Sequence, residues 1–176
     1  FFNILTYAFV NSADNSGCQN VKFMDNFNST LFFHDNWHVT HVKHVKNTTN
    51  EMFCQEFETA KDGEELFVEY DYTKKSNDNN VRCECRTKVE NGKPIPFKCV
   101  KNDKSTFEVE FTIMGTDYDD YAVLYRCVTL KTGSKADNYV LLRRESGADE
   151  IPEKAKSLTA GLNLELCKEI TKSFVA

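Results

Sequence analysis

The segment between Phe107 and Cys127 constrains the fold most, because it contains the complete pattern of a β-hairpin. Apolar and polar side chains alternate over 107–113, which is the period-two pattern of a strand with one buried and one solvated face. The turn-forming residues of 115–120 follow, and a β-branched and aromatic run resumes over 121–130. A helix does not produce this alternation, so the segment predicts antiparallel sheet.

Similar stretches, separated by runs rich in Asn, Asp, Gly and Ser, predict eight strands in all. We expect these strands near 36–46, 51–59, 65–73, 80–89, 95–101, 105–114, 120–130 and 138–145. Eight strands close a small barrel that is just wide enough for side chains or for one small ligand. The sequence therefore predicts an all-β fold, an eight-stranded antiparallel barrel, with a short helical lid at 23–33 over one end.

The hydrophobic period changes after the predicted barrel. Acidic residues precede Pro152, and apolar residues continue at helical spacing over 155–159 until Gly161, which predicts one short helix. Leucines then alternate with polar residues over 162–166. This pattern predicts a final short strand that brings Cys167 to a partner.

The length of 176 residues suits one good core and is short for two, so we expect a single domain over 13–176. The apolar stretch 1–10 is too short to span a bilayer as a helix and is typical of the end of a signal peptide. We interpret residues 1–12 as a partial signal peptide that is cut after Ser12. The alternative is that this stretch forms an N-terminal strand of the fold.

Cysteine usage and glycosylation signals indicate a secreted, extracellular protein. Seven cysteines fit an oxidising compartment far better than the cytosol, and sequons at Asn28 and Asn47 agree with secretion. Cys83 and Cys85 lie on one face of a predicted strand and are awkwardly spaced for bonding each other, so we expect one of them to bridge to Cys99 across a hairpin. The cysteines lack the short-spaced pairs of a zinc site, so no metal is expected.

Composition argues against several classes of function. The net charge of -5 argues against a nucleic-acid partner, because phosphate neutralisation needs clustered Lys and Arg. The sequence has no Gly-rich phosphate loop, nucleophile elbow or paired histidine motif. We therefore expect a protein that is not an enzyme, carries no cofactor and has neither nucleic acid nor a membrane as partner. We also expect a monomer.

Four histidines lie close together, at 34, 38, 41 and 44. The β-branched residues around them favour a strand, in which His41 faces opposite to His38 and His44. The latter two lie ~20 Å apart at ~3.3 Å per residue, so one ion cannot bridge them. We interpret these residues as surface and cavity histidines, with His41 on the face of Trp37 and a candidate for the cavity.

Three landmarks occur in order along the chain: Trp37 at the start of the first strand, Thr116-Asp117-Tyr118 before the seventh, and Arg144 at the end of the eighth. This set resembles the lipocalin signature. In lipocalins a Trp at the barrel base packs beneath an Arg from the last strand, and a cation over an indole face is a sensible plug for the closed end. The first motif departs from the pattern, because Asp35 stands where a Gly is usual.

Within the lipocalins, the chain is similar to the triabin, pallidipin and nitrophorin group of salivary proteins from blood-feeding triatomine bugs. The likeness is carried by residues 2–9, by Phe32-Phe33 and by 116–127. Members of the group are known for an altered order of their early strands, which the sequence leaves open here. The resemblance implies a free thiol at Cys83 and three disulfides, which are Cys18–Cys127, Cys54–Cys167 and Cys85–Cys99.

The nitrophorins in this group carry haem through one histidine on an early strand. The matching position here is Glu69. Because a carboxylate is not the usual axial ligand of haem, we expect no haem cofactor.

The interior of the barrel is the candidate binding site. If Cys127 faces outward, alternation directs Arg126 inward, and a buried guanidinium needs an acidic partner or a ligand anion. One interpretation is an ion pair with an inward Glu or extension to the rim. The other is that Arg126 holds the carboxylate of a lipid mediator whose tail fills the apolar remainder. The candidate ligand-binding residues are Arg126, Leu124, Ala122, His41, Val39, Phe107 and Phe111.

The resemblance implies a secreted salivary lipocalin that perturbs host haemostasis or defence. We expect it to sequester a small hydrophobic or amphipathic host mediator, and the inward cation favours an eicosanoid over a biogenic amine. The alternative is a protein-protein inhibitor of a coagulation protease, as triabin is of thrombin. In that case the outer carboxylates of Glu84, Glu108 and Glu110 would meet a basic exosite.

Overall fold

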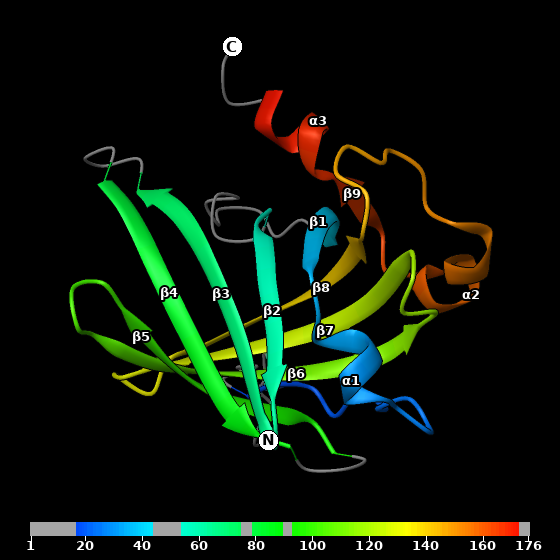
Figure 1. Cartoon of the computed structure of the whole chain (residues 1–176). Coiled ribbons are helices and arrows are strands. Elements are labelled where there is room, and N and C mark those ends of the chain that lie inside the picture. The colour runs from blue at the N-terminus through cyan, green and yellow to red at the C-terminus, as the bar shows by residue number, and fades with distance from the viewer. Residues whose placement is uncertain (1–16, 44–53, 75–78, 90–92, 173–176) are drawn as a thin grey trace, which may run out of the picture.

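The computed structural model describes residues 17–43, 54–74, 79–89 and 93–172. Most of them form strands, and eight strands close into an antiparallel barrel (Figure 1), which confirms the predicted fold class. The barrel strands are β1 (Asn36–Lys43), β2 (Glu56–Asp62), β3 (Glu65–Lys74), β4 (Asn79–Lys88), β5 (Ile95–Lys101), β6 (Thr106–Thr116), β7 (Tyr121–Leu130) and β8 (Lys135–Arg143). The expected signal peptide at 1–12 and the sequon at Asn47 lie outside the described residues.

The strands follow one another around the barrel in chain order, which answers the question of early strand order that the sequence left open. Each strand from β2 to β8 pairs with the next, and β1 pairs with β8 on one side and with β2 on the other. The register of β1 with β2 covers only 36–38. Further along, the same edge of β1 is taken by a ninth strand, β9 (Leu164–Leu166), which pairs with 41–43.

Strands β6 and β7 form the hairpin predicted from the alternation, in register from Phe107 opposite Leu130 to Thr116 opposite Ala122. β8 begins at Lys135 rather than at 138, because the turn before it is tight. Gly133 adopts the positive φ of 87° that favours glycine, so pairing with β7 starts at once after the turn. The parts of the first two predicted strands within 44–53 lie outside the described residues.

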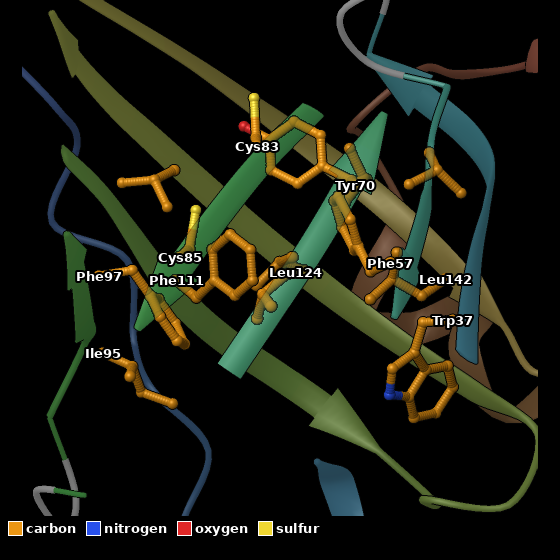
Figure 2. Packing of buried hydrophobic residues seen from close by; sticks show 14 of the residues in the cluster. Trp37, Phe57, Tyr70, Cys83, Cys85, Ile95, Phe97, Phe111, Leu124 and Leu142 are labelled. Atoms are coloured by element: carbon orange, nitrogen blue, oxygen red, sulfur yellow. The ribbon is translucent and has the colours of Figure 1, made fainter. Parts of the chain in front are cut away.

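Aromatic side chains fill the barrel interior from its closed end. The short helix α1 (Ser29–Phe32) lies there within the predicted lid, with Phe32 buried. Further in, the Phe111 ring centroid lies 5.1 Å from that of Phe97 and 5.8 Å from that of Phe57. Figure 2 shows these rings packed between the strands. The lower part of the barrel is therefore a packed core rather than an open pore.

The chain after β8 packs on the outside of the barrel. The 3-10 helix η2 (Glu153–Ala155) and α2 (Lys156–Thr159) form the predicted short helical segment, and Ala155 is buried on Tyr121 of β7. Gly115 allows this close approach, since a Cβ added there would lie 2.3 Å from Leu158 Cδ1. The predicted final strand is β9, and α3 (Cys167–Lys172) follows it without a counterpart in the sequence prediction. None of the described helices is long and apolar enough to cross a membrane.

Three disulfides tie the barrel, and they join the pairs that the family resemblance implied. Cys18–Cys127 fastens the N-terminal segment to the outer face of β7, and Cys54–Cys167 fastens the segment before β2 to the start of α3, directly after β9. Cys85–Cys99 joins β4 to β5 and is buried in the core. The remaining thiol, Cys83, is buried and free among the described cysteines.

Candidate functional site

The closed end of the barrel is built around Trp37 and Arg144. The Arg144 guanidinium carbon lies 3.6 Å from the centre of the indole, and Trp37 Nε1 donates a hydrogen bond to the Phe32 carbonyl over 3.0 Å. Arg144 Nε also donates to the Tyr118 carbonyl over 3.0 Å. These contacts join the lid, the first strand and the seventh-strand turn, so the pair stabilises the base rather than offering a binding site.

The residues Thr116-Asp117-Tyr118 close the turn before β7. Thr116 Oγ1 donates to the Tyr121 carbonyl over 2.6 Å and accepts from the Tyr118 backbone N–H over 2.8 Å. The Asp117 carboxylate accepts from the Tyr121 backbone N–H over 3.0 Å. Asp35, where lipocalins usually carry Gly, has a φ of 51°, a left-handed conformation that Asp tolerates better than most residues.

His41 lies outside the barrel wall, which shows that the expected place on the Trp37 face and in the cavity was wrong. The pairing of β1 with β8 shifts register between Val39 and His41, and this β-bulge alters the alternation of faces. Val39 and Val42 therefore join the core, whereas His41 pairs with Leu141 of the outer cluster. Burial lowers the pKa of His41.

The other candidate residues all lie on the inner face, although not in one place. Phe111 is directly opposite Arg126 in the β6–β7 register, which brings these two together. Leu124 lies one inward position closer to the closed end, and Ala122 lies one further. Phe107 lies toward the open end. Of these candidates, Phe111 is therefore the one that lies beside Arg126.

Arg126 is buried inside the barrel, with 4% of its surface exposed. Its Nη1 donates to Gln55 Oε1 over 3.1 Å, and its guanidinium carbon lies 5.9 Å from the centre of the Phe57 ring. Burial lowers the pKa of Arg126, but a guanidinium keeps its charge throughout the physiological range. The inward direction predicted from the outward Cys127 agrees with this position.

Polar side chains that the sequence analysis missed lie around Arg126. Gln55 lies directly before β2, and Asn138 of β8 stands directly opposite Arg126 in the β7–β8 register. Tyr70 and Cys83 face each other across β3 and β4, and Figure 2 shows the Tyr70 ring beside the Cys83 side chain. Burial raises the pKa of both the Tyr70 hydroxyl and the Cys83 thiol. The sequence analysis missed Asn138 because it placed the start of the eighth strand at 138, and a residue at a strand end is expected to be exposed.

The outer wall of the barrel carries clusters of charged residues. Arg82 gathers carboxylates from two neighbouring strands, at 3.2 Å from Glu58, 2.5 Å from Glu69 and 2.9 Å from Asp71. Glu69, the position that matches the nitrophorin haem ligand, therefore lies on the outer wall rather than in the interior. Glu84 is opposite Glu69 in the β3–β4 register and extends this group.

Glu108 and Glu110 lie on a different part of the outer wall. They line a hollow of about 690 Å³ over β4 to β7 together with cationic residues, among them Arg86 and Lys98. Lys98 stands directly opposite Glu108. The three glutamates expected to form one acidic surface are thus divided between two areas, only one of which is dominated by carboxylates.

Histidines and carboxylates of the described residues do not form a metal centre. Within 17–43, 54–74, 79–89 and 93–172 no group of three or more His, Cys, Asp or Glu is placed to hold an ion. His34 Nδ1 is 2.9 Å from Asp35, and His38 Nδ1 is 3.6 Å from Glu56. These are local pairs on the outer surface.

An antiparallel eight-stranded barrel in chain order, closed at one end by an Arg over a Trp, is the arrangement of a lipocalin. A model of the triabin family matches residues 11–158, and the chain belongs to this family. The chain is 32% identical to Procalin of Hospesneotomae protracta over 171 residues, which covers 95% of each protein. It is 33% identical to Triabin of Meccus pallidipennis over 145 residues, which covers 81% of this chain and 86% of the relative.

Solved structures share the fold. A mutant of LTBP1 in complex with leukotriene C4 is 25% identical, with a TM-score of 0.61 over 82% of this chain and 89% of the other. The amine binding protein of Rhodnius prolixus in its tryptamine complex has a TM-score of 0.66 at 18% identity, over 89% of this chain and 88% of the other. The second likeness concerns the fold alone.

Proposed function

We propose that this protein is a secreted, non-enzymatic lipocalin that sequesters a small amphipathic carboxylate of the eicosanoid class in its barrel. By removing such a mediator it would perturb haemostasis or defence in a host. The mature protein in this proposal is the single domain 13–176, released after removal of residues 1–12. Three disulfides support an oxidising, extracellular location.

The observation that carries the proposal is the buried guanidinium of Arg126 above the ring of Phe57. A buried cation is stabilised by opposite charge and by hydrogen bonds, and Gln55 offers Arg126 a neutral oxygen as acceptor. A ligand carboxylate would give Arg126 a charge-assisted, bidentate partner. The apolar side chains of Phe111, beside Arg126, and of Phe107, toward the open end, would then contact the hydrocarbon tail.

The leukotriene C4 complex of LTBP1 supports an eicosanoid as the ligand class, because that protein has the same fold at 25% identity. A biogenic amine would require a carboxylate on the inner face of the barrel to pair with its ammonium group. Among the described residues the inner face around Arg126 carries amide, hydroxyl and thiol groups instead. These groups suit an anionic ligand better than a cationic one.

Calorimetric titration tests the proposal directly. We expect wild-type protein to bind leukotriene, thromboxane or prostaglandin acids and to ignore tryptamine. Arg126→Leu should weaken binding of the acids at least tenfold, since one charged hydrogen bond contributes about 1.5–3 kcal/mol. Arg86→Leu, which changes an exposed cation of the outer wall, is the control and should bind as wild type does. Equal affinity of the Arg126 variant and wild type would reject the proposal.

A second candidate function is inhibition of a coagulation protease through the outer surface. The specific observation is the cluster of carboxylates around Arg82, which is formed by Glu58, Glu69 and Asp71 and lies beside Glu84. The excess negative charge would steer association with a basic exosite, and Triabin is a 33% identical relative. In this case plasma clotting time should lengthen while calorimetry shows no small ligand. Charge reversal of Glu84 and Glu69 should then shorten the clotting time again.

A further inference from the structure

Asn138 is a buried amide without a partner in the barrel interior. The side chain is 3% exposed, and neither its Nδ2 nor its Oδ1 has a hydrogen-bond partner among the described residues. It stands directly opposite Arg126 on the neighbouring strand, so the two side chains project from the same inner face. Its unused donor and acceptor therefore lie beside the cation of the proposed site.

An unpaired buried amide is unfavourable, because it loses its hydrogen bonds to water on folding and gains none in return. The neighbouring inward positions of β8 indicate which type of residue packing alone would favour at 138. Val140 and Leu142, the next two inward residues of β8, are apolar and belong to the core. Asn138 therefore differs from its neighbours in a way that folding alone does not explain.

The neighbouring polar groups have partners of their own. Gln55 accepts from Arg126 over 3.1 Å, and the Tyr70 hydroxyl hydrogen-bonds the Cys83 thiol. The amide of Asn138 is thus the group of this cluster that offers both a free donor and a free acceptor. A hydroxyl is the complementary group, since it both donates and accepts.

We propose that Asn138 is a specificity-determining residue that hydrogen-bonds a hydroxyl of the bound ligand, next to the carboxylate held by Arg126. This inference rests on the proposed function and narrows its ligand class to hydroxylated fatty-acid carboxylates. An unmodified fatty acid would leave the amide unpaired in the complex. A site built to hydrogen-bond a hydroxyl discriminates strongly against the analogue that lacks it.

The test compares two acids that differ by one hydroxyl. The probes are arachidonic acid and its 5-hydroxy derivative, titrated by calorimetry into wild-type protein and variants. We expect wild type to bind the hydroxylated acid about 10- to 100-fold more tightly, which corresponds to the worth of a satisfied buried polar group. Asn138→Leu should reduce this ratio to about one, mainly through weaker binding of the hydroxylated acid. Tyr139→Phe, which removes an outward hydroxyl from the same strand, should keep the wild-type ratio.

The outcomes separate this inference from the proposed function. If wild type binds both acids equally, or if Asn138→Leu keeps the full preference, the role of Asn138 is rejected while the role of Arg126 stands. If Arg126→Leu leaves both affinities unchanged and Asn138→Leu still removes the preference, the anchoring role of Arg126 fails alone. Binding of neither acid by wild type rejects both. If Asn138→Leu does not fold, Asn138→Val suits a strand, and the wild-type ratio decides the matter by itself.

Discussion

The central carbon of the Arg144 guanidinium lies 3.6 Å from the centre of the Trp37 indole ring. Arg144 follows the last barrel strand, and Trp37 is the second residue of the first, so this single contact joins the two ends of the barrel sequence. The guanidinium also donates to the carbonyls of Tyr118 and Phe32. A cation in this position therefore closes the base of the barrel by contacts with an aromatic face and with backbone oxygens.

Loss of the Arg144 side chain should destabilise the protein. We expect Arg144→Leu to lower the free energy of unfolding by about 2–4 kcal/mol, because a partly buried cation–π contact and several hydrogen bonds to carbonyls are removed together. Urea denaturation followed by tryptophan fluorescence measures the change. The exposed Arg86→Leu is the matched control and should alter stability by less than about 0.5 kcal/mol. A loss of unfolding free energy no larger than that of the control would contradict the role of Arg144 in closing the base of the barrel.

The three disulfides should differ in their contributions because their loops differ in length. Cys54–Cys167 has a sequence separation of 113 and Cys85–Cys99 one of 14. Chain entropy predicts about 4.7 kcal/mol for a loop of roughly 100 residues and about 3 kcal/mol for one of roughly 15. Replacing both cysteines of each bridge by alanine and comparing denaturation midpoints tests the order. A larger loss from the short loop would indicate that packing of the buried Cys85–Cys99 bridge outweighs entropy.

The thiol of Cys83 should be unreactive in the folded protein. It is buried, and desolvation raises its pKa, so little of the reactive thiolate forms at mildly alkaline pH. Labelling with a thiol reagent at pH 8 should be at least about 100-fold slower in native protein than in urea. Rapid labelling without denaturant would contradict this placement. Slow labelling would also agree with a monomer, since an inaccessible thiol cannot join two chains.

His41 should make the protein less stable in weak acid. Burial lowers the pKa of His41 in the folded state below its ordinary value of 6.5, so the unfolded chain binds the proton more readily. Its contribution to stability is therefore complete above pH 6.5 and declines as the pH falls below that value. The melting temperature of wild type should fall between pH 7.5 and pH 5 by more than that of His41→Gln. An equal fall in the melting temperatures of wild type and His41→Gln over this pH range would contradict the role of His41.

The sequence predicted features that depend on local alternation. The alternation over 107–113 and the turn residues that follow it predicted the hairpin of 107–127. Counting alternate residues from an outward Cys127 predicted that Arg126 points inward. This prediction holds because β6 and β7 pair without interruption where Arg126 lies. The same counting failed at His41, since the bulge after Val39 leaves no mark in the residue pattern.

The polar cluster in the interior could not be predicted because it is assembled from different strands. Gln55, Asn138 and Tyr70 become neighbours of Arg126 only through the closure of the barrel and the register between strands. Each of them looks like an ordinary strand residue in the sequence. The triabin-family disulfides, in contrast, were available from the resemblance, because they depend on positions that relatives share rather than on packing.

The short strand β9 covers the part of β1 that β2 leaves unpaired, and Cys54–Cys167 holds it there. A variant truncated before Leu164 would present bare backbone donors and acceptors along 41–43, and such an edge invites pairing with another molecule. We therefore expect the C-terminal segment to prevent association through this strand edge. Shortened versions should precipitate or associate at concentrations where the full chain remains dispersed.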